Sequence, residues 1–118
     1  MELERLSDFT AKVDAIEVTN ERSTINASAE MESYGRVRFS LTLESGGDRS
    51  GGMCHGSGRG AMADGTFFSG QFCGVWSRAG TTITARYIDH VSDGTVNLYV
   101  ATFDARGDEM LFEQHRFA

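Results

Sequence analysis

Hydrophobic and polar residues alternate with a period of two along most of this chain. The clearest run is 36–43, where four apolar residues alternate with arginine, serine and threonine. Weaker runs of the same kind lie at 25–31 and from about residue 8 to residue 19. A period of two is typical of a β-strand with one buried and one exposed face. The pattern therefore predicts three strands in the first part of the chain, preceded by a helical turn within the first seven residues.

Turn residues punctuate the second part of the chain at intervals of about a dozen residues. They are Asp64-Gly65, Ala79-Gly80, Asp93-Gly94 and Arg106-Gly107. Glycine accepts the positive φ that tight hairpin turns need, so these pairs predict a meander of five strands joined by short loops. A longer glycine-rich segment at 44–52 precedes them, and it predicts a loop at one rim that could act as a lid.

The predicted fold is all-β: a small antiparallel up-and-down barrel of about eight strands, in one domain that covers residues 1–118. Closure is expected because it removes the two exposed edges that an open meander would leave. This architecture is similar to the calycin-like and allene-oxide-cyclase-like barrels, which include both ligand carriers and isomerising or cyclising enzymes. The similarity is one of topology alone and transfers no residue roles.

Register follows if each turn is a two-residue loop, because loop length fixes strand pairing. One face of the last five strands then collects apolar side chains and should be the interior. Its apolar members are Met53, Phe68, Phe72, Trp76, Ile83, Tyr87, Val91, Val96, Leu98, Val100, Leu111 and Phe117. The same face receives five ionisable groups, namely His55, Arg59, Asp89, Glu113 and His115. Such groups are rarely buried without partners, so they indicate a site.

The sharpest expectation concerns Arg59 and Asp89, which should point into the barrel and meet above Gly70. The missing side chain of that glycine leaves room for both. The candidate ligand-binding residues are His55, Arg59, Phe72, Trp76, Tyr87, Asp89, Glu113 and His115.

Two alternatives stay open for this site. A small barrel could contain a satisfied Arg59–Asp89 pair, with the remaining ionisable groups solvated at the rim. A one-residue error at any turn would invert a strand. In the last strand, such an error would send Glu113 and His115 outside and bring Met110, Phe112 and Gln114 in.

Three functions are compatible with these residues. The first is a binding module for a small, partly apolar ligand, with walls formed by Phe68, Phe72, Trp76 and Tyr87, and with Arg59 or His55 holding a polar group. The second is a proton-transfer enzyme, in which His55 or His115 is the acid or base, Asp89 or Glu113 orients it, and Arg59 stabilises negative charge. The third is a structural or interaction protein without a small ligand. A cavity of several hundred Å³ lined by Arg59 and Asp89 would favour the first two, and a filled barrel the third.

The composition of the chain disfavours some classes of binding partner. With 17 acidic against 11 basic residues the net charge is −6, which opposes binding to nucleic acids and to anionic membranes. The chain shows neither a secretory leader nor a membrane-spanning apolar run, so a cytoplasmic location is expected. Cys54 and Cys73 lie outside any Cys-x-x-Cys spacing and are expected to be reduced thiols.

No cofactor or metal is expected. The glycine-rich run at 56–60 resembles a phosphate-binding loop only in composition, because no helical period follows it. Two histidines and a carboxylate could form a metal triad, but their spacing gives no local support for one.

The face opposite the predicted interior is unusually small and apolar for a solvated surface. Its members are Cys54, Gly56, Gly58, Gly60, Met62, Phe67, Ser69, Gln71, Cys73, Val75, Ile88, Tyr99, Ala101 and Phe103. Such a face is expected to be covered, either by the N-terminal segment or by a second subunit. We therefore expect a homodimer that buries the region around Gly58, Val75 and Phe103.

Overall fold

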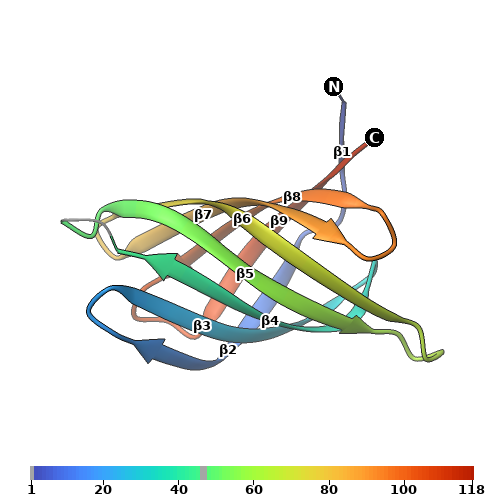
Figure 1. Cartoon of the computed structure of the whole chain (residues 1–118), viewed down its shortest axis with the longest axis horizontal. Helices are drawn as coiled ribbons and strands as arrows, with labels where there is room; N and C mark the ends of the chain where they lie inside the picture. The colour runs from blue at the N-terminus through green and yellow to red at the C-terminus, as the bar shows by residue number, and fades with distance from the viewer. Residues whose placement is uncertain (1, 46–47) are drawn as a thin grey trace.

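The computed structural model describes residues 2–45 and 48–118, which form one antiparallel sheet without helices (Figure 1). Its strands are β1 (Leu3–Arg5), β2 (Phe9–Val18), β3 (Arg22–Met31), β4 (Gly35–Glu44), β5 (Gly51–Ala61), β6 (Phe67–Ala79), β7 (Thr82–Val91), β8 (Val96–Asp104) and β9 (Glu109–Phe117). β9 pairs with both β8 and β2, so β2 to β9 close into an eight-stranded barrel. The predicted fold class is confirmed. No helix in the described part of the chain is long and apolar enough to cross a membrane.

The N-terminal segment forms a strand, so the expected helical turn is wrong. β1 pairs with the second half of β9, from His115 to Phe117, while the first half of β9 pairs with β2. The two ends of the chain therefore leave the barrel side by side (Figure 1). The predicted lid at 44–52 falls partly outside the described residues, at Gly46 and Gly47.

Two hairpin loops contain three residues instead of the assumed two. In the first, the Met62 N–H donates to the Thr66 carbonyl at 2.8 Å, and Gly65 has a φ of 94°. In the second, the Val91 N–H donates to the Thr95 carbonyl at 2.9 Å, and Gly94 has a φ of 91°. A three-residue loop of this kind places its left-handed glycine last. Each extra loop residue shifts the register by one and exchanges the faces of the adjoining strands.

The register of β5 corrects the predicted interior. Arg59 pairs with Ser69 instead of Gly70, so β5 turns Cys54 and the glycines at 52, 56, 58 and 60 inward and Met53 outward. Between β6 and β7 the error is two residues, because Trp76 pairs with Ala85 instead of Ile83, and the predicted faces are preserved.

β8 and β9 are inverted together by the three-residue loop that precedes β8. Their mutual register is as predicted, with Val100 opposite Glu113. The buried residues of these strands are Asn97, Tyr99, Ala101, Phe103, Met110, Phe112 and Gln114. Val96, Leu98, Val100 and Leu111, which we expected inside, alternate with them on the outer face.

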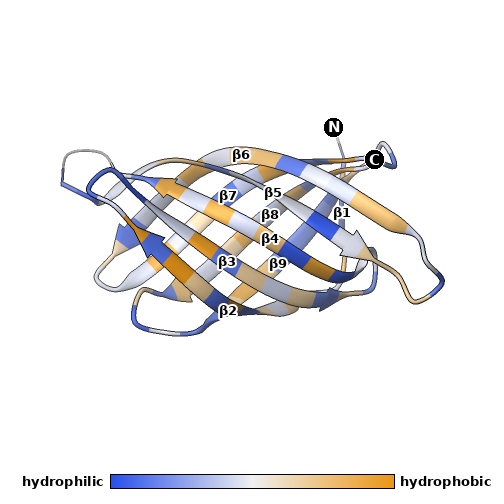
Figure 2. Ribbon diagram, turned by 60° about the horizontal axis from the view of Figure 1, so that its bottom comes forward, coloured by the Kyte–Doolittle hydropathy of each residue, from blue (hydrophilic) through white to orange (hydrophobic). Residues whose placement is uncertain are grey.

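The barrel interior combines large side chains with glycines that make room for them. A Cβ at Gly56 would lie 2.5 Å from the ring of Phe72, and one at Gly60 would lie 2.6 Å from the Tyr34 carbonyl. Apolar and polar positions alternate along the strands (Figure 2), and the apolar set forms one core that includes the fully buried Leu41 and Met110. Small residues opposite large ones are what a narrow barrel needs in order to fill its interior.

Candidate functional site

The barrel interior contains a small cavity of about 50 Å³. Its wall is formed by Phe9, Met31, Tyr34, Val37, Phe39, Gly58, Arg59, Gly60, Phe68, Ser69, Gly70, Phe72, Tyr87, Asp89, Val91, Tyr99 and Phe112. Most of these residues are aromatic or aliphatic. The cavity has room for about four water-sized groups.

Asp89 is the acid of this cavity. Its residue surface is only 8% exposed, and it leans over Gly70, where an added Cβ would lie 2.6 Å from Oδ1. Its carboxylate accepts no hydrogen bond from any residue in the described ranges. Burial raises the pKa of Asp89 to about 6; the neighbouring His90 opposes this rise, and Asp93 adds to it. No fully buried side-chain oxygen of the described residues lacks a partner, so the Asp89 oxygens reach the open space of the cavity, where a ligand or water can donate to them.

Two tyrosines border the carboxylate. Tyr87 stacks on Phe72 with ring centroids 4.3 Å apart, and lies 5.5 Å from the Tyr99 ring. Burial raises the pKa of both hydroxyls well above the ordinary value, and the Asp89 charge acts in the same direction. Both tyrosines are therefore neutral around pH 7, so Asp89 is the charged side chain that points into the cavity, while Arg59 borders it from an outer-facing position.

A polar cluster closes the barrel end nearest this cavity. The Tyr34 hydroxyl accepts hydrogen bonds from Asn97 Nδ2 at 2.8 Å and from an Arg116 guanidinium N–H at 2.9 Å. It also lies 2.7 Å from the Thr95 hydroxyl, and Gln114 Nε2 donates to Asn97 Oδ1 at 3.2 Å. Because Asn97 and Gln114 are buried, each bond here satisfies a group that water does not reach.

Tyr34→Phe is expected to destabilise the protein by about 2 kcal/mol, because it removes the acceptor that serves the buried Asn97 amide and the Arg116 guanidinium. Urea unfolding followed by the fluorescence of Trp76, the single tryptophan, measures the effect. Tyr87→Phe is the control, since the Tyr87 hydroxyl makes no hydrogen bond to a described residue. Equal stability of Tyr34→Phe and the wild type would show that the cluster does not stabilise the barrel.

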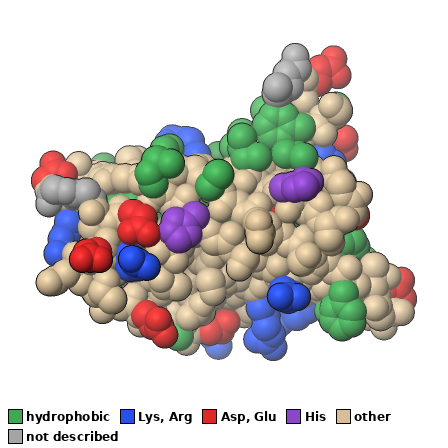
Figure 3. All heavy atoms as spheres, viewed as in Figure 1, with side chains coloured by type: hydrophobic (Ala, Val, Ile, Leu, Met, Phe, Trp, Pro, Cys, Tyr) green, Lys and Arg blue, Asp and Glu red, His purple; other side chains and the backbone are tan. Residues whose placement is uncertain are grey.

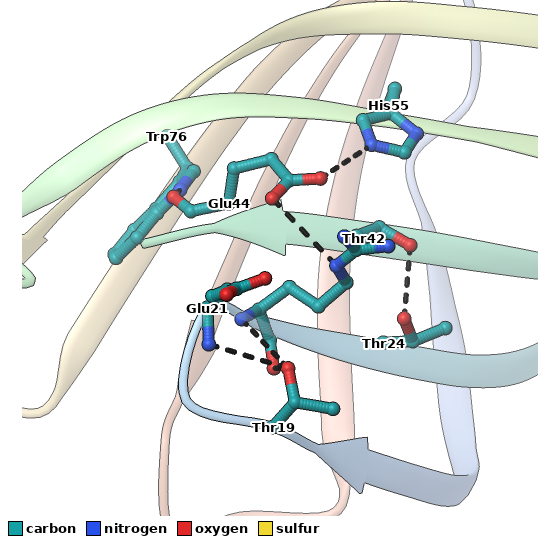
Figure 4. Close-up of polar contacts among 8 residues, drawn as sticks. Thr19, Glu21, Thr24, Thr42, Glu44, His55 and Trp76 are labelled. Atoms are coloured by element: carbon teal, nitrogen blue, oxygen red, sulfur yellow. Dashed lines mark hydrogen bonds and ion pairs between the residues drawn. The ribbon is translucent and has the colours of Figure 1, made fainter. Parts of the chain in front are cut away.

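The structure divides the eight predicted site residues between two faces. Phe72, Trp76, Tyr87 and Asp89 are buried inside the barrel, whereas His55, Arg59, Glu113 and His115 lie on outer-facing positions. Phe72, Tyr87 and Asp89 border the cavity. Trp76 lies toward the opposite end, where its Nε1 donates to the Glu44 carbonyl at 2.9 Å (Figure 4).

The expected meeting of Arg59 and Asp89 is wrong. The extra residue in the 62–66 turn rotates Arg59 to the outside, while Asp89 stays inside above Gly70. His55 is also outside, where its Nε2 lies 3.0 Å from Glu44 Oε1 (Figure 4). The acids and bases of the proposed proton-transfer set therefore do not converge on one point.

Glu113 and His115 lie outside, as the inverted-strand alternative described. His115 Nε2 is 3.4 Å from Glu113 Oε2, and Arg5 of β1 lies 3.5 Å from the other oxygen of Glu113. These are exposed or half-buried pairs, which contribute little stability.

Sequence reasoning missed the polar cluster at the barrel end. Tyr34 lies between two predicted strands and reads as a turn residue, and Asn97 and Arg116 occupy positions predicted to face outward. Of the residues in this cluster, only Gln114 was named as an interior residue, in the alternative in which the last strand is inverted. The available signal was the polar residues where β8 begins and β9 ends, namely Asn97, Gln114 and Arg116, which a correct register would have turned inward.

The two cysteines are free thiols on opposite faces of the sheet. Cys54 is buried and Cys73 is exposed. They lie on the paired strands β5 and β6, where Cys54 is opposite Gly74 and Cys73 is opposite His55. Burial raises the pKa of Cys54 to about 11, so this thiol is inert near neutral pH. Within the described ranges, no group of three or more His, Cys, Asp and Glu side chains could hold a metal ion.

No family model, no curated protein and no solved structure matches this chain. The similarity to calycin-like barrels therefore remains a prediction from topology.

Proposed function

We propose that the barrel binds a small ligand with an apolar body and a donor group, such as a primary amine, whose donor faces Asp89. The observation that carries this proposal is the buried carboxylate of Asp89, which receives no hydrogen bond from the described residues and borders a cavity with apolar walls. A ligand amine would supply both the donor and the opposite charge.

The corrected register reverses the polarity of the expected ligand. With Arg59 and His55 inside, the barrel would hold an acceptor such as a carboxylate. With Asp89 as the charged group of the cavity, it selects a donor or a cation instead. The aromatic wall supports the same choice, because aromatic rings attract organic cations.

The size of the cavity limits the ligand. At about 50 Å³ it falls well short of several hundred Å³, so a ligand that enters without rearrangement has only a few heavy atoms. The same tight packing favours a second candidate, a structural or interaction protein that uses its outer surface. A cytoplasmic location and a homodimer also remain proposals.

The outer surface supports the homodimer only in part. Gly58 and Phe103, expected on the buried interface, belong to the inward-facing positions of β5 and β8, and Phe103 is only 8% exposed. Val75 does face outward, together with the exposed Met53 and Ile88.

A matched pair of probes tests the proposed ligand. Isobutylamine and isobutanol have the same shape and differ in charge, so binding measured by NMR shifts at pH 7.5 should favour the amine by at least about tenfold. Asp89→Asn keeps the shape of the side chain but removes its charge, and should abolish this preference. Native mass spectrometry of freshly purified protein would show a co-purifying ligand and the oligomeric mass together.

Two outcomes would overturn the proposal. One is that neither probe moves the resonances of Phe72, Tyr87 or Gly70. The other is that Asp89→Asn leaves the preference for the amine intact, since the carboxylate would then not be the recognition group.

A further inference from the structure

A second, larger concavity lies on the outside of the barrel, across β3 to β7. This groove has a volume of about 760 Å³ and is lined mainly by polar side chains. The outward-facing members of its lining are Asn26, Arg38, Ser40, Ser57, Arg59, Ser69, Gln71 and His90. It is separated from the interior cavity by the wall that contains the Gly58–Gly70 pair.

Strand register arranges the lining in two parallel rows. The first row contains uncharged donors and acceptors that pair directly from strand to strand, ending at an imidazole: Asn26, Ser40, Ser57, Gln71 and His90. The second row contains the two arginines of the groove, Arg38 and Arg59, and ends at Ser69. The two rows lie two residues apart on each strand, which is about 6.8 Å, so side chains from both rows can reach a single small molecule.

Arg38 and Arg59 stand directly opposite one another on β4 and β5. Like charges in this position destabilise a sheet. Among the described residues, neither guanidinium has a carboxylate within 4.0 Å, whereas the adjacent Arg36 pairs with Glu30 at 3.1 Å. Asp14 is the acid that borders the groove.

The local charge runs against that of the whole chain. The protein carries a net charge of −6, yet basic side chains gather over the lower right of the face in Figure 3, where β4 and β5 run. A concentration of unpaired cations in a concave, polar surface of an acidic protein favours an anionic partner. The row of amides and hydroxyls beside it suits hydroxyl groups of the same partner.

We infer that this groove binds a small polyhydroxylated molecule carrying a phosphate or sulfate ester. Arg38 and Arg59 clamp the ester oxygens, because guanidinium donors match oxyanions in a bidentate geometry. Ser40, Ser57 and Gln71 face the hydroxyl-bearing body. The inference is independent of the proposed interior ligand, since the two sites lie on opposite sides of the sheet and require opposite charge.

The test uses glucose 6-phosphate, glucose 6-sulfate, glucose and inorganic phosphate as probes, with binding followed by NMR shifts of the full chain. The two esters should bind more tightly than glucose or inorganic phosphate, and should move resonances of Arg38, Arg59 and Gln71. Raising the salt from about 20 mM to about 500 mM should weaken ester binding through screening. A difference between phosphate and sulfate identifies which ester the groove takes.

Substitution of the two arginines tests whether they bind the ester. Arg38→Gln and Arg59→Gln should each weaken ester binding by at least about tenfold, and the double variant should abolish it. Arg106→Gln, in the β8–β9 turn, changes the net charge equally and should have no effect. An equal loss in Arg106→Gln, or binding of glucose as tight as that of its esters, would overturn the inference. Equal affinity for inorganic phosphate and the esters would overturn the part assigned to the uncharged row.

Discussion

Gly74→Ala is expected to destabilise the barrel by about 3 to 5 kcal/mol, which is more than the roughly 1 to 3 kcal/mol that overpacking typically costs. An added Cβ would collide with the Arg86 carbonyl oxygen, and would lie 2.6 Å from the Tyr87 Cα. Both atoms belong to the backbone of β7, which pairs with β6 along ten residue pairs. They cannot move aside without disturbing that ladder, so the strain cannot be relieved by a side-chain rotation.

Guanidinium unfolding monitored by the fluorescence of the buried Trp76 gives the free energy of unfolding for the variant and the wild type. Gly107→Ala is the matched control. There the nearest atom to an added Cβ is the Asp104 carbonyl oxygen at 3.5 Å, an ordinary contact. We expect that substitution to be neutral or to stabilise by up to about 1 kcal/mol through the unfolded state. A Gly74→Ala protein as stable as the control would contradict the close approach of β6 and β7.

The eight strands of the barrel and their order could be predicted from the sequence, because alternation and turn residues are local signals, whereas the short strand β1 could not. Val37, Phe39, Leu41 and Leu43 lie on the inward positions of β4, as their period of two requires. The register across β5 and β6 could not be predicted in the same way. An Asp-Gly pair fits both a two-residue loop and a three-residue loop that ends in left-handed glycine, and the difference decides which face of a strand is buried.

Asp89 was placed correctly for a reason that is partly accidental. The predicted register between β6 and β7 was wrong by two residues, and an even error leaves each side chain on its predicted face. Arg59 was placed on the wrong face because the predicted register between β5 and β6 was wrong by one residue. The aromatic residues and Asp89 of the candidate site therefore lie inside the barrel as predicted, whereas Arg59 does not. The groove that holds Arg38 and Arg59 was not foreseen, since a surface row is visible only once the pairing of five strands is known.

Asp89→Asn is expected to stabilise the protein near pH 7.5 by at most about 3 kcal/mol and to change its stability little at pH 4. The pKa of Asp89 rises from 3.8 to about 6 on folding, mainly because burial disfavours the charged form. At 1.36 kcal/mol per pKa unit, keeping this group ionised in the folded state costs about 3 kcal/mol. Asparagine carries no charge and avoids that cost.

The sign follows from proton binding. Between about pH 4 and pH 6 the folded protein holds a proton on Asp89 that the unfolded chain has released, so stability falls as the pH rises through this window. Urea unfolding of both proteins from pH 4 to pH 8 should therefore give curves that lie close together near pH 4, diverge between about pH 4 and pH 6, and stay separated by a constant amount above about pH 6. Asp93→Asn is the control with the opposite sign, because hydrogen bonds from Thr95 lower the pKa of Asp93.

Parallel curves for the wild type and Asp89→Asn across this range would show that the carboxylate is well solvated, and the argument for an interior ligand would fall with it. Separated curves would show that the folded protein keeps a destabilising charge in its interior, which is common at functional sites. A bound amine should then recover part of that cost. Saturating isobutylamine is expected to raise the stability of the wild type at pH 7.5 and to leave Asp89→Asn unchanged, because only the ionised carboxylate distinguishes the amine from its neutral analogue.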